Sequence, residues 1–479
     1  MPNMLAYLML CVWPLVTILL FRRLPPGRAL IWTILGGYMI LPPRAALDLL
    51  ILPDLDKFAI ASLSALFALA TAKEGLPKLL PVSMLGRLLL AIFILSPIGT
   101  VLTNSDVILF GYGGLPGMQI QELPTMVLER IIVAIPFLLG RALLHDDEAL
   151  RDILVALVIA GLIYSIPMLI EVRLSPQINV WVYGFFQHDF GQMMRYGGFR
   201  PIVFMPHGLW VALFALMTFL AALALARTEA GPMRTRYMFA ALYLLVVLYL
   251  CKSAGVLVYV VFLAPVVLFM RQRAQIAVSA ALACLALLYP ALRGAQLVPV
   301  DWIVAQAMSF DADRAGSLVY RLNNEALLIG HAAERSLFGW GGWARNHLHD
   351  VISGQRLSVI DGRWIEVMSV SGWAGFVGEF GLLALPLLVL ARVSFTARTK
   401  LSRYAGPLAL IYAANLFDLL PNATLVPLTW LLAGAILGHA ELGSASRSAA
   451  TPRHRQSEPA PWAKSRSRAD ANLRATPKS

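Results

Sequence analysis

Residues 367–392 read VMSVSGWAGFVGEFGLLALPLLVLAR, and this stretch decides the fold class of the chain. Its apolar part, residues 371–391, matches the length of about 20 residues that a helix needs to cross a bilayer. Backbone amides and carbonyls find no water to bond inside lipid, so such a segment must satisfy them within an α-helix. The stretch therefore predicts a transmembrane helix.

Segments of the same kind recur through the chain, which is 59% hydrophobic and 14% charged. Soluble domains contain about 25% charged residues, so this composition indicates a membrane protein. Apolar runs lie at residues 5–21, 29–42, 58–72, 88–102, 126–144, 152–170, 208–226, 238–251, 255–270, 276–292, 371–391, 404–420 and 423–440. The first run lacks a preceding basic region and a following cleavage site, so we expect a retained helix. We predict an all-α, polytopic transmembrane helix bundle over residues 1–442, with about 12 to 13 spans.

The basic residues between the runs indicate the orientation of this bundle. If the runs alternate in direction, one face collects Arg22, Arg23, Arg28, Lys73, Lys78, Arg87, Arg227, Arg234, Arg236, Arg271, Arg273 and the basic residues of 392–403. Connector 43–57, on the other face, is acidic. Basic loops stay in the cytoplasm, so we assign the first face to the cytoplasm. The Ser-, Arg- and Pro-rich residues 443–479 fall there too, and we expect a disordered basic tail.

The opposite, periplasmic face carries two long loops, at about residues 171–207 and 293–370. Basic residues are usually concentrated in cytoplasmic loops, but these two loops contain Arg195, Arg200, Arg314, Arg321, Arg345 and Arg363. Lys252, in the sequence CKSAG between two spans, falls on the same face. Guanidinium groups match the oxygens of a diphosphate in pairs, so these cations predict an anionic ligand. The alternative is that they pair with nearby acids or lipid headgroups. In a membrane protein the net charge of +12 is interpreted from the positions of the charges, so we expect no nucleic-acid partner.

The polar segment SFDADRAGSLVYRLNNEALLIGHAAERSLFGWGGWARN, residues 309–346, belongs to the second loop. Residues 314–335 predict an amphipathic helix that lies on the bilayer surface or caps the bundle. Arg314, Arg321 and Glu325 are seven and four residues apart, which places them on one face. The glycines of residues 339–342 are expected to end this helix and to free backbone N–H groups for phosphate.

These residues resemble the O-antigen ligase/polymerase superfamily of bacterial polytopic membrane proteins. The resemblance rests on CKSAG, on the block 314–346, on the Gly-rich closing helix 367–392 and on the large late loop, and it is best from Arg195 to Arg392. It implies glycan transfer from an undecaprenyl-diphosphate carrier at the periplasmic face of the bacterial inner membrane. A polymerase transfers to another lipid-linked repeat, and a ligase transfers to lipid A-core.

The resemblance also implies residue roles. Arginines of the two outer loops hold the diphosphate, and by position these are Arg195 or Arg200 and Arg314 or Arg321. Family ligases carry a His-Asn pair before the closing helix, where this chain has Asp361, Gly362, Arg363 and Trp364. This departure leaves open both the choice between ligase and polymerase and the identity of the base.

The residues fit a metal-independent, inverting displacement without a cofactor. Arginines can neutralise a diphosphate leaving group as a metal does elsewhere, while the acceptor hydroxyl needs a base. Candidate bases are Glu325, Asp361, His331 and His207. We favour Glu325 because it shares a helix face with Arg314 and Arg321, although it could instead be a structural partner of Arg321. The sequence HLHD, residues 347–350, reads as metal ligands or as solvated surface, and we predict no metal. The rival functions are a transporter or flippase, or a non-catalytic export component, for lipid-linked polysaccharide. The concentration of charge in the loops favours surface chemistry over transport.

Overall fold

The computed structural model describes residues 1–442 apart from 50–52, 73–74, 196, 311 and 397–400. The predicted tail at 443–479 and the predicted cytoplasmic Lys73 lie outside the described residues, and so does the side chain of Arg314.

Every apolar run predicted from the sequence forms a helix. The helices are α1 (Met4–Arg23), α2 (Pro26–Ile40), α3 (Lys57–Ala70), α4 (Met84–Leu102), α5 (Leu123–Leu143), α6 (Asp147–Leu174), α8 (Gly208–Thr228), α9 (Gly231–Leu250), α10 (Ala254–Phe269), α11 (Gln272–Gly294), α14 (Arg363–Thr396), α15 (Ala405–Asp418) and α16 (Pro427–Glu441). Among the described residues, 8 helices are long and apolar enough to cross a membrane. The all-α membrane bundle is therefore confirmed.

The number of long apolar helices in the described part of the chain is smaller than the predicted number of spans, because some of the helices are short. The shorter helices have 14 to 16 residues, against about 20 for a full crossing. They are α2, α3, α10, α15 and α16. The prediction of 12 to 13 spans depends on whether each of these also crosses, and it stays a prediction.

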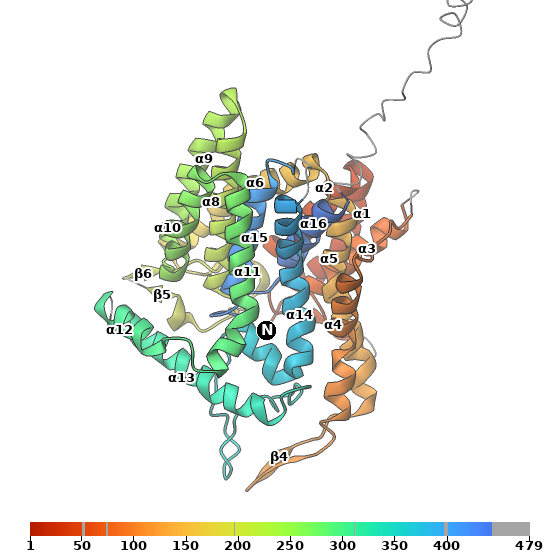
Figure 1. Ribbon diagram of the computed structural model, residues 1–479, viewed down its shortest axis with the longest axis vertical. Coiled ribbons are helices and arrows are strands. Elements are labelled where there is room, and N and C mark those ends of the chain that lie inside the picture. The colour runs from red at the N-terminus through yellow and green to blue at the C-terminus, as the bar shows by residue number, and fades with distance from the viewer. Residues whose placement is uncertain (50–52, 73–74, 196, 311, 397–400, 443–479) are drawn as a thin grey trace, which may run out of the picture.

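The remaining elements lie in the connectors. They are α7 (Ile178–Tyr183), α12 (Val300–Phe310), α13 (Ala312–Glu334), the 3₁₀ turns η1 (Ile120–Glu122) and η2 (Phe190–Met193), and the strands β1 (Ala46–Leu47), β2 (Leu55–Asp56), β3 (Ile108–Phe110), β4 (Gly113–Leu115), β5 (Met194–Arg195) and β6 (Gly198–Phe199). The strands pair as the antiparallel hairpins β1–β2, β3–β4 and β5–β6. Figure 1 shows α12, α13 and the hairpin at β4 at its lower end, with β5 and β6 beside them.

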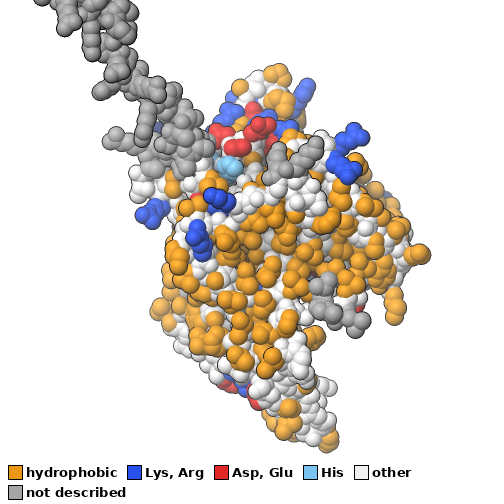
Figure 2. Space-filling view, turned by 90° about the vertical axis from the view of Figure 1, so that its right-hand side faces the viewer, with side chains coloured by type: hydrophobic (Ala, Val, Ile, Leu, Met, Phe, Trp, Pro, Cys, Tyr) orange, Lys and Arg blue, Asp and Glu red, His pale blue; other side chains and the backbone are white. Residues whose placement is uncertain are grey.

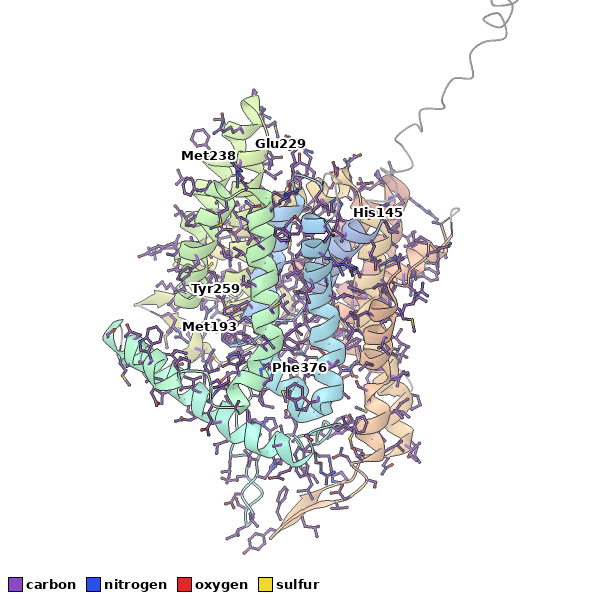
Figure 3. The ribbon with its side chains drawn as sticks, viewed as in Figure 1. His145, Met193, Glu229, Met238, Tyr259 and Phe376 are labelled. Atoms are coloured by element: carbon purple, nitrogen blue, oxygen red, sulfur yellow. The ribbon has the colours of Figure 1, made fainter. Side chains whose placement is uncertain are left out.

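The connectors divide between the two ends of the bundle. Arg28 bonds Asp152 at 2.6 Å and Arg151 bonds Glu229 at 2.7 Å, which ties together connectors that the sequence assigned to one face. Figure 2 shows a broad band of hydrophobic side chains, with most of the visible charged side chains gathered towards the upper end. Figure 3 places His145 and Glu229 at this upper end and Phe376 towards the lower one. Which end faces the cytoplasm stays a prediction.

The two long loops are shorter than predicted because the adjoining helices extend into them. Helix α6 continues to Leu174, whereas the first loop was predicted from residue 171. Helix α14 begins at Arg363, so the predicted loop end at residue 370 lies inside that helix. The polar helix α13 lies across the lower end of the bundle and contacts α14, as expected for a helix that caps the bundle.

Candidate functional site

The β5–β6 hairpin carries Arg195 and Arg200 to the start of α8. The amide of Arg200 donates to the Met193 carbonyl at 2.8 Å, and its buried side chain packs on the first turn of α8. A Cβ added at Gly208 would lie only 2.6 Å from Arg200 Nε, so that position has no room for a side chain. Lys252, from the α9–α10 connector, donates from Nζ to the Arg195 carbonyl at 3.0 Å. Three predicted cations therefore meet here.

Two charged side chains that the sequence did not single out hold this loop in place. Glu171 Oε2 accepts from the amides of Ile202 and Val203, each at 2.8 Å. Lys57 Nζ donates to the Phe204 carbonyl at 2.9 Å. A buried charge is stabilised only when it is hydrogen-bonded, so these residues make residues 202–204 a rigid support for Arg200.

His207 caps the N-terminus of α8. Its Nδ1 accepts from the Leu209 amide at 3.1 Å, and its Nε2 lies 3.3 Å from Gln192 Oε1. Burial lowers the pKa of His207 to about 3, and nearby positive charges act in the same direction. These charges belong to Arg200, His188, Arg195 and Arg321. Because Nδ1 already serves as the cap acceptor in the neutral ring, His207 is poorly placed as a general base.

Arg321 reaches the connector between α15 and α16. Its guanidinium donates to Asn422 Oδ1 at 3.2 Å and to the Pro421 carbonyl at 3.3 Å. Its Nε lies 3.8 Å from Asp361 Oδ2, and both side chains are partly exposed. We name Arg195, Arg200, Lys252 and Arg321 the cation cluster. Lys252 bonds the Arg195 carbonyl, and the charges of Arg195, Arg200 and Arg321 all act on His207.

Glu325 pairs with a different arginine from the one the helical spacing suggested. Arg293, at the end of α11, donates from Nε to Glu325 Oε1 at 2.6 Å, and Tyr289 donates to the same oxygen at 3.1 Å. Burial raises the pKa of Glu325, and the hydrogen bond from Arg293 opposes that shift. The interpretation of Glu325 as a structural partner fits this geometry, but the partner is Arg293 rather than Arg321.

The glycine-rich segment docks on a break in α14 instead of presenting free amides. At Gly372 the backbone has φ of 61°, which a residue with a side chain rarely adopts, and the helix is interrupted. Across the break, Trp340 and Gly341 donate to the carbonyls of Ser369 and Val370 at 2.8 and 2.9 Å. In return, residues 373 and 374 donate to the carbonyls of residues 336 and 337. The Gly339 amide donates to the Arg335 carbonyl, so the amides of Gly339 and Gly341, which were expected to bind phosphate, bond the backbone instead.

Arg345 links two outer loops and is fully buried. Its guanidinium donates to the carbonyls of Asp106 and Pro116 at 2.9 and 2.8 Å, and to that of Trp340 at 3.2 Å. Arg335 donates to both carboxylate oxygens of Asp106, at 3.0 and 2.6 Å, and holds the pKa of Asp106 below its usual value. The donors of Arg345 are therefore largely used for loop packing, away from the cation cluster.

Arg363, also predicted as a diphosphate ligand, belongs to a buried ion network. It donates to both oxygens of Glu379, at 2.6 and 2.8 Å, and to Glu366 at 3.0 Å. Arg130 of α5 donates to the same Glu379 at 3.2 Å. Sequence reasoning missed Glu379, although a single carboxylate inside an apolar run signals a paired or functional group.

A cavity of about 1000 Å³ opens beside this network, and we name it the α3–α5–α16 cavity. Its charged and indole lining consists of Arg44, Asp54, Asp56, Glu122, Glu129, Arg130, Trp343, Arg363 and Trp430. Ala423, also in the wall, follows Asn422, to which Arg321 donates. Burial lowers the pKa of His188, and the charges of Arg44 and Arg200 act in the same direction. The cavity therefore adjoins the cation cluster.

The other candidates from the sequence have local structural contacts. The ring of His331 stacks on Trp340 with 4.3 Å between centroids. In HLHD, Asp350 accepts from the amide of Ser353 at 2.7 Å and His347 Nδ1 lies 3.2 Å from the Ser358 carbonyl. Within the described residues, no group of three or more His, Cys, Asp or Glu side chains could hold a metal ion. Arg314 lies in the first turn of α13.

No protein-family model matches the chain, and no curated protein matches it.

Proposed function

We propose that this protein transfers glycan from an undecaprenyl-diphosphate carrier to an acceptor hydroxyl at the periplasmic face of the bacterial inner membrane. It would act as a polymerase or a ligase of O-antigen or related polysaccharide. The observation that carries the proposal is the cation cluster, in which the charges of Arg195, Arg200 and Arg321 act on His207 and Lys252 bonds the Arg195 carbonyl. The family resemblance supplies the substrate class.

In this proposal the cation cluster holds the diphosphate of the donor. Arginine pairs the phosphate oxygens in a fixed geometry, and positive charge aimed at the leaving group lowers the barrier as the glycosidic bond breaks. Arg345 and Arg363 are assigned to holding the loops and the bundle, because carbonyl and carboxylate groups already engage them. Arg321 lies between Asn422 and Asp361, so it is the member of the cluster nearest to a candidate base.

Asp361 is the proposed base. It is partly exposed and lies 3.8 Å from Arg321, whereas Glu325 is engaged by Arg293 at 2.6 Å and His207 caps α8. The acceptor hydroxyl would give its proton to Asp361 and attack the anomeric carbon from the side opposite the diphosphate. The bond from that carbon to the diphosphate oxygen then breaks, and undecaprenyl diphosphate leaves with the bonding electrons. The product has inverted configuration.

The proposal is tested by replacing Arg321 with alanine in a strain that lacks the native gene. Surface glycans are separated on a gel, and the amount of protein in the membrane is measured in parallel. Arg321→Ala is expected to abolish transfer at an unchanged protein level. Arg356→Ala is the matched control, because it removes an exposed arginine from the same loop, and it should retain transfer. Full transfer by Arg321→Ala would refute the role.

A transporter or flippase for lipid-linked polysaccharide is the second candidate. Two observations favour it, namely the buried Arg130–Glu379–Arg363 network and the interruption of α14 at Gly372. Transporters place ion pairs and broken helices of this kind at their substrate pathway. Purified protein in liposomes with a lipid-linked glycan separates the two functions, because an enzyme lengthens or transfers the glycan while a flippase moves it unchanged.

A further inference from the structure

The α3–α5–α16 cavity has the size and position of a second ligand site. Small-molecule sites span about 300 to 1,000 Å³, and this cavity of about 1000 Å³ is at the upper end of that range. Its wall is formed by the β1–β2 hairpin, by α3, by the first turns of α5 and by the start of α16. Its wall includes Ala423 and Arg363, which are close in sequence to Asn422 and Asp361, the two residues that Arg321 of the cation cluster contacts.

The charge of the cavity is opposite to that of the cation cluster. Four carboxylates line it, those of Asp54, Asp56, Glu122 and Glu129, against three guanidinium groups, those of Arg44, Arg130 and Arg363. Two of its guanidinium groups, on Arg130 and Arg363, are engaged by Glu379 and Glu366 from behind the wall. Within the part of the chain that the structure describes, Asp54, Glu122 and Glu129 form no ion pair.

The negative lining affects which ligands can enter. An anionic ligand would meet several carboxylates at close range in a partly desolvated site, where like charges repel more strongly than in water. A neutral or cationic ligand meets no such repulsion. The cavity and the cation cluster therefore select opposite kinds of group, although they adjoin.

The uncharged part of the lining suits a saccharide. Trp343 stands at the rim with 74% of its surface exposed, so its indole face is open to the apolar face of a sugar ring. Gln121, Thr125 and Ser62 add amide and hydroxyl groups, which pair with sugar hydroxyls as the carboxylates also do. An aromatic platform combined with several hydrogen-bonding groups is the chemistry that recognises a polyhydroxylated ring.

We infer that this cavity binds the acceptor saccharide and that it selects a sugar without anionic groups, with Trp343 as the stacking residue and Glu129 as a determinant of charge selectivity. The inference rests on the proposed function for the identity of the acceptor. An acceptor held here lies beside Arg363, two residues from Asp361 in the chain, while the donor diphosphate is held by the cation cluster.

The test measures saccharide binding without any donor. Full-length protein in lipid nanodiscs is titrated calorimetrically with three trisaccharides. They are the trimers of N-acetylglucosamine (neutral), glucosamine (cationic) and galacturonic acid (anionic). The neutral and cationic probes are expected to bind, and the anionic probe about tenfold or more weakly. Trp343→Ala should lower the affinity for the neutral probe about tenfold, and Trp343→Phe should largely restore it.

Charge variants test the selectivity. Glu129→Gln should reduce the discrimination against the anionic probe severalfold, whereas Glu334→Gln, an exposed carboxylate on α13 outside the cavity, should leave it unchanged. Equal binding of the anionic and neutral probes, or no binding of any probe at millimolar concentration, would overturn the inference. Unchanged saccharide affinity in both Trp343→Ala and Glu129→Gln would also overturn the inference. This holds even if Trp343→Ala lowers the amount of protein in the membrane.

The two proposals fail in different ways. Arg321 belongs to the cation cluster, so Arg321→Ala should leave binding of the neutral trisaccharide intact. Retained glycan transfer by Arg321→Ala would reject the proposed function while the cavity still binds sugar. Loss of transfer in that variant, combined with saccharide binding that does not depend on Trp343 or Glu129, would reject only the inference that the cavity binds the acceptor saccharide.

Discussion

Replacing Glu379 with glutamine is expected to destabilise the protein strongly. Glu379 has 1% of its side chain exposed and accepts three hydrogen bonds, two from Arg363 and one from Arg130. The amide of glutamine carries no negative charge, so the change leaves two largely buried guanidinium groups without their common counter-ion. Breaking a buried ion pair from one side costs about 3–5 kcal/mol.

Glu366→Gln is the matched control, because it changes the other carboxylate that contacts Arg363. Glu366 is 36% exposed and bonds Arg363 at 3.0 Å, so water can replace it. An ion pair of this exposure is worth about 0–1 kcal/mol. The free energy of unfolding is measured for both variants by titration with SDS in mixed micelles.

A double-mutant cycle makes the test specific to the Arg363–Glu379 pair. In an Arg363→Met background, Glu379→Gln should cost less than in the native chain, because one of the two stranded guanidinium groups has been removed. Equal costs for Glu379→Gln and Glu366→Gln, or additivity in the cycle, would refute the view that the charge of Glu379 stabilises the buried ion network.

The remaining predictions concern the end of the bundle that α13 covers. Gly372→Ala should cost about 1–3 kcal/mol in the same SDS titration, because φ is 61° there and an added Cβ would lie 2.4 Å from the Leu337 carbonyl carbon; an unchanged stability contradicts the account of the helix break. Arg335 lowers the pKa of Asp106, so their bond should stabilise the loop above about pH 4 and be lost as the pH falls through the lower folded-state pKa. Proteolysis of residues 103–122 should therefore increase at acid pH, and Arg335→Met should remove that dependence; the same acid response in both proteins would contradict it. Treatment with a chelator should leave glycan transfer intact. A loss of transfer that is reversed by adding a divalent ion would support the metal interpretation of HLHD.

Short-range patterns account for the parts of the structure that the sequence predicted well. Each apolar run became a helix because its backbone can be satisfied only locally, whichever helices surround it. The polar helix at residues 314–335 was found within a few residues of α13, Ala312–Glu334, because its amphipathic spacing is also local. The clustering of Arg195, Arg200 and Lys252 followed from the alternation of helices, which brings their connectors to one end.

What the sequence by itself determined is the list of helices and the end of the bundle at which each loop emerges, because helix formation in lipid depends on residues a few positions apart. Only the tertiary structure decided which charges meet. Helical spacing placed Glu325 beside Arg321, but α11 supplies Arg293 to it, 32 residues away in the chain. Glu379 meets Arg130, which is 249 residues away, and so α5 and α14 share one buried ion network. Partners so distant are set by the packing of whole helices, and no local pattern in the sequence records that packing.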